Sequence, residues 1–220
     1  MSPSPSASPR KRGINTTIVL LALFIVIVVG GFVWVMVKPR VMSEGALRAH
    51  GLFLFERARD IGDFALLDDA GKPFTPADLK GKWTLLYFGF TYCPDVCPTT
   101  LALLSQFYNQ LPKEFAADTQ IALVSVDPAR DTPAKLHDYV HYFNPTFRGV
   151  TGEFLDLQKF ATSMNVPFVK VPGGTPDNYQ VEHSGNVVLL NADGHYIGFF
   201  KSPQTLDNLS KTYVSVRQSH

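Results

Sequence analysis

The sequence contains little cysteine and almost no net charge. Two cysteines in 220 residues are too few for the disulfide framework of a small secreted scaffold. A formal net charge of +1 gives no basis for a nucleic-acid partner. Hydrophobic residues make up 45% of the chain, which is typical of a globular core and excludes a wholly disordered protein. The length suits one ordinary domain with attachments, and the two cysteines are redox-active, bind a metal or form a single structural bridge.

The first part of the chain consists of a polar tail and an apolar run. Residues 1–13 predict a disordered cytoplasmic tail, because Ser, Pro and Ala dominate its start and a basic cluster ends it. Residues 14–37 carry no charged side chain and are long enough to cross a bilayer as a helix. Trp34 suits the headgroup level. A cleaved signal peptide would have a shorter apolar region and a small-x-small cleavage site, so we expect an uncleaved transmembrane anchor.

The charges around the anchor predict its orientation. Three basic residues precede the apolar run, and Lys38 and Arg40 follow it, so the positive-inside rule weakly favours an inside amino terminus. The amino terminus lacks the Arg-rich and Ser-rich pattern of a mitochondrial presequence. We expect a single-pass protein of the bacterial inner (cytoplasmic) membrane whose soluble domain faces the periplasm, with the mitochondrial inner membrane as the alternative. Residues 38–60 are interpreted as a juxtamembrane connector.

Residues 61–220 predict one α/β domain. Residues 85–90 are apolar on both faces, as in a buried central strand, and a helix is expected at 98–111. The other expected elements are a hairpin at 64–74, a helical turn at 76–79, a strand at 120–126, helices at 133–143 and 152–164, an extended mobile loop at 166–182, a hairpin of strands 187–190 and 196–201, and a helix at 204–216. Parallel strands joined by helices, with an antiparallel hairpin at the end, form a mixed sheet flanked by helices.

Cys93 and Cys97 lie between the central strand and the helix that follows it. Such a turn lies at the carboxyl edge of the sheet, where α/β folds bind ligands. Pro98 fits only the first turn of a helix, so we expect Cys97 near the helix start and Cys93 on the loop before it. Backbone N–H groups at a helix amino end favour thiolates. A thiolate pair suits a soft ion, with Cu(I) as the leading candidate and Zn(II) as the rival, although a structural zinc site normally needs four ligands.

A third ligand, if present, would be a histidine. The candidates are His50, His137, His141, His183, His195 and His220. His183 precedes strand 187–190, whose start packs beside the cysteine turn in a thioredoxin-like sheet, and this position favours it over a purely structural histidine. His137 and His141 are four residues apart and could share a helical face, but such a face is more often solvated than metal-binding. His195 follows a hairpin turn and is expected at the surface.

Two levels of resemblance follow from these motifs. A reactive pair at the first strand-to-helix turn resembles the thioredoxin fold, although thioredoxins have two residues between the cysteines and this chain has three. More specifically, three motifs resemble the SCO/SenC family, namely residues 88–100 (FGFTYCPDVCPTT), 125–133 (SVDPARDTP) and 179–184 (YQVEHS). They follow the family's order behind a single anchor. The resemblance implies a membrane-anchored, thioredoxin-like copper-binding protein that assists the binuclear copper site of cytochrome c oxidase.

The resemblance also implies roles for individual residues. Cys93, Cys97 and His183 fall on the family's copper ligands. Asp127 falls on an acidic position of the second motif, where its charge either supports the ligands from behind or contacts a partner, or where it caps the turn. Glu182 departs from the family, which more often has Asp before the histidine, but it keeps the charge.

Two functions remain open for this site. The first is a copper chaperone in which Cys93 and Cys97 take Cu(I) and His183 helps to hold Cu(II). Its expected partners are the copper-binding subunit of cytochrome c oxidase as acceptor, another periplasmic copper chaperone as donor, and the membrane. The second is an enzyme, a thiol–disulfide oxidoreductase that reduces cysteines of the oxidase subunit or of another exported protein through a mixed disulfide. An inert structural disulfide is a third and weaker reading. His183 discriminates the first two, because a dithiol reductase does not need it.

Overall fold

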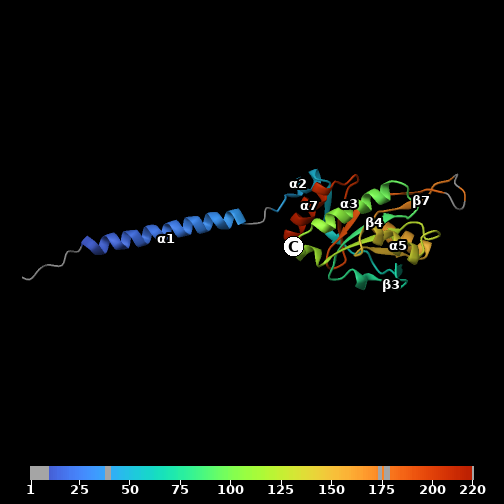
Figure 1. The fold of residues 1–220 in the computed structure, drawn as a ribbon, viewed down its shortest axis with the longest axis horizontal. Coiled ribbons are helices and arrows are strands. Elements are labelled where there is room, and N and C mark those ends of the chain that lie inside the picture. The colour runs from blue at the N-terminus through green and yellow to red at the C-terminus, as the bar shows by residue number, and fades with distance from the viewer. Residues whose placement is uncertain (1–9, 38–40, 173–174, 176–178, 220) are drawn as a thin grey trace, which may run out of the picture. The chain divides into compact units, whose positions relative to one another are not determined.

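The computed structural model describes residues 10–37, 41–172, 175 and 179–219. The chain divides into two compact units, residues 1–40 and residues 41–220, and each is described by itself (Figure 1). Residues 1–9 of the predicted tail lie outside the described residues.

The first unit contains one long helix, α1 (Arg10–Val37). Its segment Thr16–Trp34 has a mean hydropathy of 2.8, none of it is buried, and it is long and apolar enough to cross a membrane. The helix begins at Arg10, so residues 10–13 continue it and do not belong to a disordered tail. The physical reason is that Arg and Lys are good helix formers, and no proline follows Pro9 within the helix.

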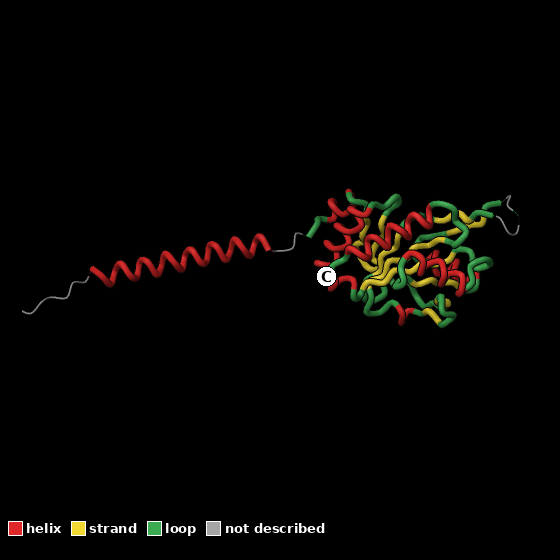
Figure 2. Tube along the Cα trace, in the orientation of Figure 1, coloured by secondary structure: helices red, strands yellow, loops and turns green. Residues whose placement is uncertain are grey.

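The second unit is built around a mixed sheet whose strand order is β1-β10-β9-β4-β5-β6-β2-β3. These strands are β1 (Leu52–Arg59), β2 (Leu66–Asp68), β3 (Pro73–Phe74), β4 (Trp83–Gly89), β5 (Thr119–Ser125), β6 (Arg148–Thr151), β9 (Val187–Leu190) and β10 (Tyr196–Phe200). The helices are α2 (Glu44–Ala49), α3 (Val96–Gln110), α4 (Lys113–Ala116), α5 (Pro133–Phe143), α6 (Phe154–Ser163) and α7 (Leu206–Ser219), with a 3-10 turn at Pro76–Asp78. Figure 2 shows the strands at the centre of this unit with helices around them.

The central strand is β4, as the apolar run predicts. All seven of its residues are buried, and it pairs in parallel with β5 and antiparallel with β9. Neighbouring side chains of a strand point to opposite faces of the sheet. Tyr87 points to Cys97 of α3, and Phe88 packs against Phe160 of α6 with ring centroids 6.1 Å apart. The sheet is therefore covered on both faces, and the predicted mixed sheet flanked by helices is confirmed.

Most of the predicted elements around this strand are confirmed with small shifts of their ends. The hairpin of β2 and β3, helix α5 and the hairpin of β9 and β10 lie where the sequence places them. Thr132 caps α5 by accepting a hydrogen bond from the Lys135 N–H, and Pro133 occupies its first turn.

One predicted boundary differs from the structure, and one strand was not predicted. The predicted connector at 38–60 contains α2 and β1, and β1 is an edge strand that pairs with β10 through Leu52 and Phe200. Leu52 is fully buried, so residues 44–59 belong to the folded unit. The sequence pattern does not predict β1, because the strand ends in charged residues. Such charges are common on the solvent side of an edge strand. Strand β6, four residues long, was also missed.

The segment predicted as an extended loop at 166–182 contains two short strands. Strands β7 (Phe168–Lys170) and β8 (Val181–His183) form a separate antiparallel ribbon in which Phe168 pairs with His183. Its Pro and Gly content predicts a loop, but all of that content except Pro167 falls in the sequence between the two strands. Residues 173–174 and 176–178 of this connection lie outside the described residues.

Candidate metal centre

The two cysteines lie where β4 ends and α3 begins. Cys97 is the second residue of α3 and is fully buried, while Cys93 lies on the preceding loop and is partly buried. The predicted arrangement is therefore confirmed, and neither cysteine is in a disulfide.

Gly89, the last residue of β4, makes room for the Cys97 thiol. A Cβ atom placed on Gly89 would lie 2.9 Å from Cys97 Sγ and 3.1 Å from Leu123 Cδ1. Non-bonded carbon and sulfur atoms do not approach so closely, so any side chain here would displace the thiol or the strand beside it.

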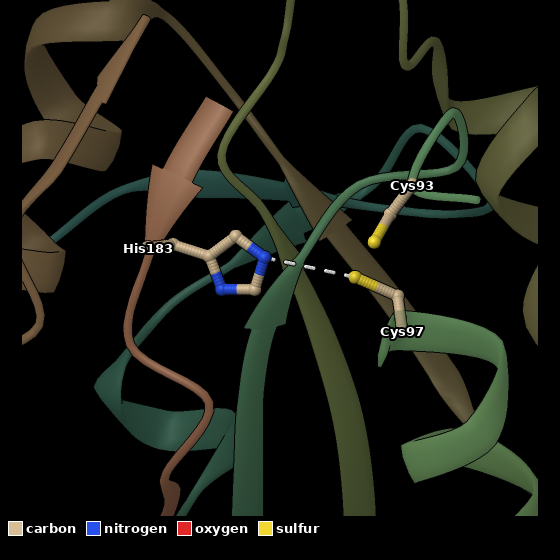
Figure 3. Close-up of side chains that lie close together, drawn as sticks. All are labelled: Cys93, Cys97 and His183. Atoms are coloured by element: carbon tan, nitrogen blue, oxygen red, sulfur yellow. Dashed lines mark hydrogen bonds between the residues drawn. The ribbon is translucent and has the colours of Figure 1, made fainter. Parts of the chain in front are cut away.

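His183 points its Nε2 atom at the cysteines. Nε2 lies 3.7 Å from Cys97 Sγ, as Figure 3 shows, and Nδ1 lies 3.0 Å from the carbonyl oxygen of Ser184. Because a carbonyl oxygen can only accept, Nδ1 carries the proton and donates a hydrogen bond to the Ser184 carbonyl. The neutral imidazole therefore presents the Nε2 lone pair to the thiols, and this orientation by a backbone carbonyl is typical of metal-binding histidines.

Three potential ligand atoms converge at this place. The sulfur atoms of Cys93 and Cys97 and a nitrogen of His183 all lie within 4.8 Å of one another. Figure 3 shows that the side chains come from the loop, the start of α3 and the end of β8, and that they point toward a common space. Two sulfur ligands and one imidazole suit a soft or borderline ion such as copper or zinc.

Burial controls the protonation of this site. The pKa of the Cys97 thiol is raised to about 12, chiefly by burial and in smaller part by the neighbouring Cys93, while the Phe90 backbone opposes the rise. At Cys97, desolvation favours the neutral thiol and so opposes the effect expected from the helix amino end. Burial also lowers the pKa of His183, which favours the neutral, ligating imidazole. A metal ion reverses the balance at sulfur, because a coordinating thiol loses its proton.

Aromatic side chains form the walls of the site. The Tyr87 hydroxyl donates to Cys97 Sγ over 3.6 Å, and burial raises the pKa of Tyr87, so this group stays a neutral donor. The rings of Tyr87 and Phe90 approach the His183 ring edge-on, with centroids 6.2 and 5.9 Å away. This apolar shell fixes the imidazole and limits the access of water.

Asp127 does not contact the ligand atoms but links the segments that carry them. Its carboxylate accepts hydrogen bonds from Arg130 Nε and from the Tyr179 hydroxyl. The Arg130 guanidinium donates to the Tyr179 carbonyl over 3.0 Å and lies over the rings of Tyr179 and Tyr92 at 3.7 and 4.6 Å. Tyr92 precedes Cys93, and Tyr179 lies four residues before His183. The Asp127 side chain is only 3% exposed, so it serves this link within the protein.

Two further residues that support the site were missed from the sequence. Arg130 is the first, and its place in the motif 125–133 is the signal that could have indicated it. The second is Asp131, whose carboxylate accepts hydrogen bonds from the N–H and hydroxyl of Thr91, at 3.1 and 2.6 Å, and from the Ser125 hydroxyl at 2.8 Å. Burial raises the pKa of Asp131, and the Thr91 and Ser125 donors oppose that rise. Asp131 thereby fixes the start of the cysteine loop.

The other candidate histidines lie apart from the cysteines. His50 Nδ1 contacts Asn208 Oδ1 at 2.9 Å, and His195 follows the β9–β10 turn. His137 and His141 lie on α5 beside Asp69. His220 lies outside the described residues.

Comparison with known proteins gives a consistent result. The family model described as SCO1/SenC matches residues 55–216. A protein of Stutzerimonas stutzeri named for copper binding is 41% identical over 165 residues, which span 75% of this chain and 80% of that protein. The Bos taurus "Protein SCO2 homolog, mitochondrial" is 32% identical over 206 residues, which span 92% of this chain and 75% of that protein. The copper-bound crystal structure of Arabidopsis thaliana ScoI is similar with a TM-score of 0.66 and 36% identity, covering 71% of this chain and 98% of that chain.

Proposed function

The chain belongs to the SCO1/SenC family, and we propose that it is a membrane-anchored copper chaperone that holds copper on Cys93, Cys97 and His183. The observation that carries this proposal is the convergence of two free thiols and one oriented imidazole nitrogen within 4.8 Å. Copper-bound structures of similar proteins support the choice of copper over zinc.

The three ligands have different tasks in this proposal. Cys97 is buried at the helix start and anchors the ion, while Cys93 is partly exposed and gives a partner access to it. Thiolates suit Cu(I), and the imidazole of His183 adds a nitrogen ligand that suits Cu(II). Release then proceeds by ligand exchange, with the partner's ligand replacing the accessible Cys93 first.

The proposed acceptor is the copper-binding subunit of cytochrome c oxidase, and the proposed donor is another periplasmic copper chaperone. The oxidase is supported by the family, whose members are cytochrome c oxidase assembly proteins. The apolar segment Thr16–Trp34 supports attachment to a membrane. We place the anchor in the bacterial inner membrane with the domain in the periplasm.

Copper titration of the reduced full chain in detergent tests the proposal. We expect one Cu(I) per wild-type chain and loss of stoichiometric binding in Cys93→Ser or Cys97→Ser. His183→Ala should retain Cu(I) but weaken Cu(II), while the control His195→Ala should match wild type. Unchanged copper content in either cysteine variant would defeat the proposal.

A thiol–disulfide oxidoreductase is the second candidate, favoured by the presence of two neighbouring free thiols. Cys93 would attack the partner's disulfide because it is the more exposed, and Cys97 would resolve the mixed disulfide. Such an activity should survive His183→Ala. Rapid reduction of a model disulfide by wild type and His183→Ala alike, without tight copper binding, would favour this candidate.

A further inference from the structure

A second cluster of ligating side chains lies away from the cysteines and has no part in the proposed function. Asp69 lies in the turn between β2 and β3, and His137 and His141 lie one helical turn apart on α5. One potential ligand atom from each of the three lies within 4.8 Å of the others.

The distances within the cluster suit a bound ion. Asp69 Oδ2 lies 3.4 Å from His137 Nδ1 and 3.6 Å from His141 Nε2. An ion with bonds of about 2.1 Å holds its tetrahedral ligands roughly 3.4 Å apart. These two distances are too long for good hydrogen bonds. They are close to the separation expected between two ligands of such an ion.

One oxygen of the Asp69 carboxylate, Oδ2, is buried without a hydrogen-bond donor among the described residues. The Asp69 side chain is 9% exposed, and among the described residues its Oδ2 atom accepts no hydrogen bond. A buried carboxylate oxygen without a donor is costly, so its persistence calls for a positive charge in front of it.

Local structure holds Asp69 in this position. The turn is fixed by Asp68 Oδ1, which accepts the N–H groups of Ala70 and Lys72 at 3.0 and 2.8 Å. A Cβ atom on Gly149 of β6 would lie 3.1 Å from Asp69 Cβ and 2.8 Å from Leu136 Cβ. Glycine at this position therefore lets the turn pack closely under α5 and aims the carboxylate at the histidines.

We propose that Asp69, His137 and His141 bind a divalent cation of the zinc class, with Zn²⁺ as the ion and water in the open position. Two imidazoles and one carboxylate form a borderline ligand set without sulfur, which suits Zn²⁺ or Cu²⁺ and disfavours Cu(I). His137 and His141 side chains are 50% and 28% exposed, so an ion and its water can reach the site from solvent.

Loading requires a small movement of the exposed ring. His137 Nε2 and His141 Nδ1 lie 3.0 Å apart and share one proton between them. If His137 Nδ1 and His141 Nε2 bind the ion, each neutral ring carries its proton on the other nitrogen. Two N–H groups would then face each other, so the half-exposed His137 ring must turn to separate them. The alternative is that the cluster binds a proton and no metal ion. A protonated imidazole would then form an ion pair with Asp69.

Zinc titration of the full chain in a Cys93→Ser/Cys97→Ser background tests the proposal without competition from the thiols. We expect one saturable Zn²⁺ per chain by equilibrium dialysis, and its loss in His137→Ala/His141→Ala. Asp69→Asn should weaken binding by at least about 10- to 100-fold, and the control His195→Ala should have no effect. Because the background lacks the copper thiols, the result is independent of the proposed chaperone function.

The outcomes separate the alternatives. Absence of saturable zinc binding would assign the cluster to a protonated ion pair and overturn the proposal. Unchanged affinity in Asp69→Asn would mean that a bare histidine pair holds the ion, which also overturns the three-residue site. Circular dichroism melts of each variant check that the fold is kept, and electron paramagnetic resonance of Cu²⁺ in the same background should show imidazole nitrogen couplings that vanish in the double histidine variant.

Discussion

At the scale of single residues, the candidate metal centre depends on a glycine as much as on the side chains that could bind the ion. Gly89 ends the central strand, and its lack of a Cβ atom lets the Cys97 sulfur pack over the backbone. The His183 imidazole is oriented by the backbone as well, because the Ser184 carbonyl accepts a hydrogen bond from Nδ1–H and Nε2 then faces Cys97. The chemistry of the ligands is therefore set by backbone atoms on both sides of the site.

The first prediction concerns Gly89→Ala. The added methyl group would lie 2.9 Å from Cys97 Sγ, so we expect the free energy of unfolding to fall by about 1–3 kcal/mol and Cu(I) affinity to fall with it. Denaturant unfolding and copper competition measure the two effects. In the control Gly45→Ala, nothing lies within 4 Å of the added atom, so copper binding should stay the same. Wild-type copper affinity in Gly89→Ala would contradict the proposed packing.

At the scale of elements, the β7–β8 ribbon brings a ligand to a sheet to which it does not belong. The ribbon is a separate pair of strands, and the segment before β8 is tied to the turn after β5 through Tyr179, Arg130 and Asp127. Because Arg130 also lies over Tyr92, the same cluster restrains the cysteine loop. The geometry of the three proposed ligands thus depends in part on this polar link between two loops.

The second prediction tests this link with Tyr179→Phe. Removal of the hydroxyl takes one donor from the buried Asp127 carboxylate, which should cost about 1–3 kcal/mol. We expect faster amide exchange in β8 and faster dissociation of Cu(II), since His183 is less firmly held. The matched control is Tyr142→Phe, because Tyr142 is 84% exposed. Equal exchange rates in β8 for both variants would show that the link does not position His183.

The sequence predicts those parts of the molecule whose signals are local. The apolar run at 85–90, the cap at Thr132 and the position of Cys97 near a helix start all follow from neighbouring residues. Arg130 and Asp131 were missed because their partners, Tyr179 and Thr91, lie 49 and 40 residues away. Such pairings depend on tertiary packing that a single sequence does not reveal.

The elements that were missed have a common physical origin. Strand β1 ends in charged residues because it is an edge strand, and β6 is short. The ribbon of β7 and β8 is interrupted by a connection rich in Pro and Gly. The pair His137 and His141 was interpreted as solvated because the carboxylate of Asp69 comes from a distant hairpin.

At the scale of the whole molecule, the candidate membrane span and the candidate metal sites lie in different units of the chain. The unit of residues 41–220 contains the sheet, the candidate copper ligands and the second cluster. The unit of residues 1–40 contains the apolar segment Thr16–Trp34. This division implies that the proposed copper site forms without the proposed anchor.

The third prediction follows from this division. Full-length protein should sediment with membranes and resist extraction by high salt, because a 19-residue apolar segment is held by the hydrophobic effect and not by charge. A chain beginning at Val41 should be soluble and bind as much copper as the full chain. Release of the full chain by salt, or loss of copper binding on truncation, would contradict the division of roles.

X-ray absorption at the copper edge, on the full chain loaded with one equivalent of Cu(I), tests the central claim most directly. The proposed site predicts two sulfur ligands in the wild type, whereas any copper that remains with the Cys93→Ser variant should have no more than one. The same measurement after oxidation to Cu(II) should show an imidazole contribution that disappears in His183→Ala. A copper environment without sulfur, or one unchanged by these substitutions, would contradict the assignment of Cys93, Cys97 and His183 as the copper ligands.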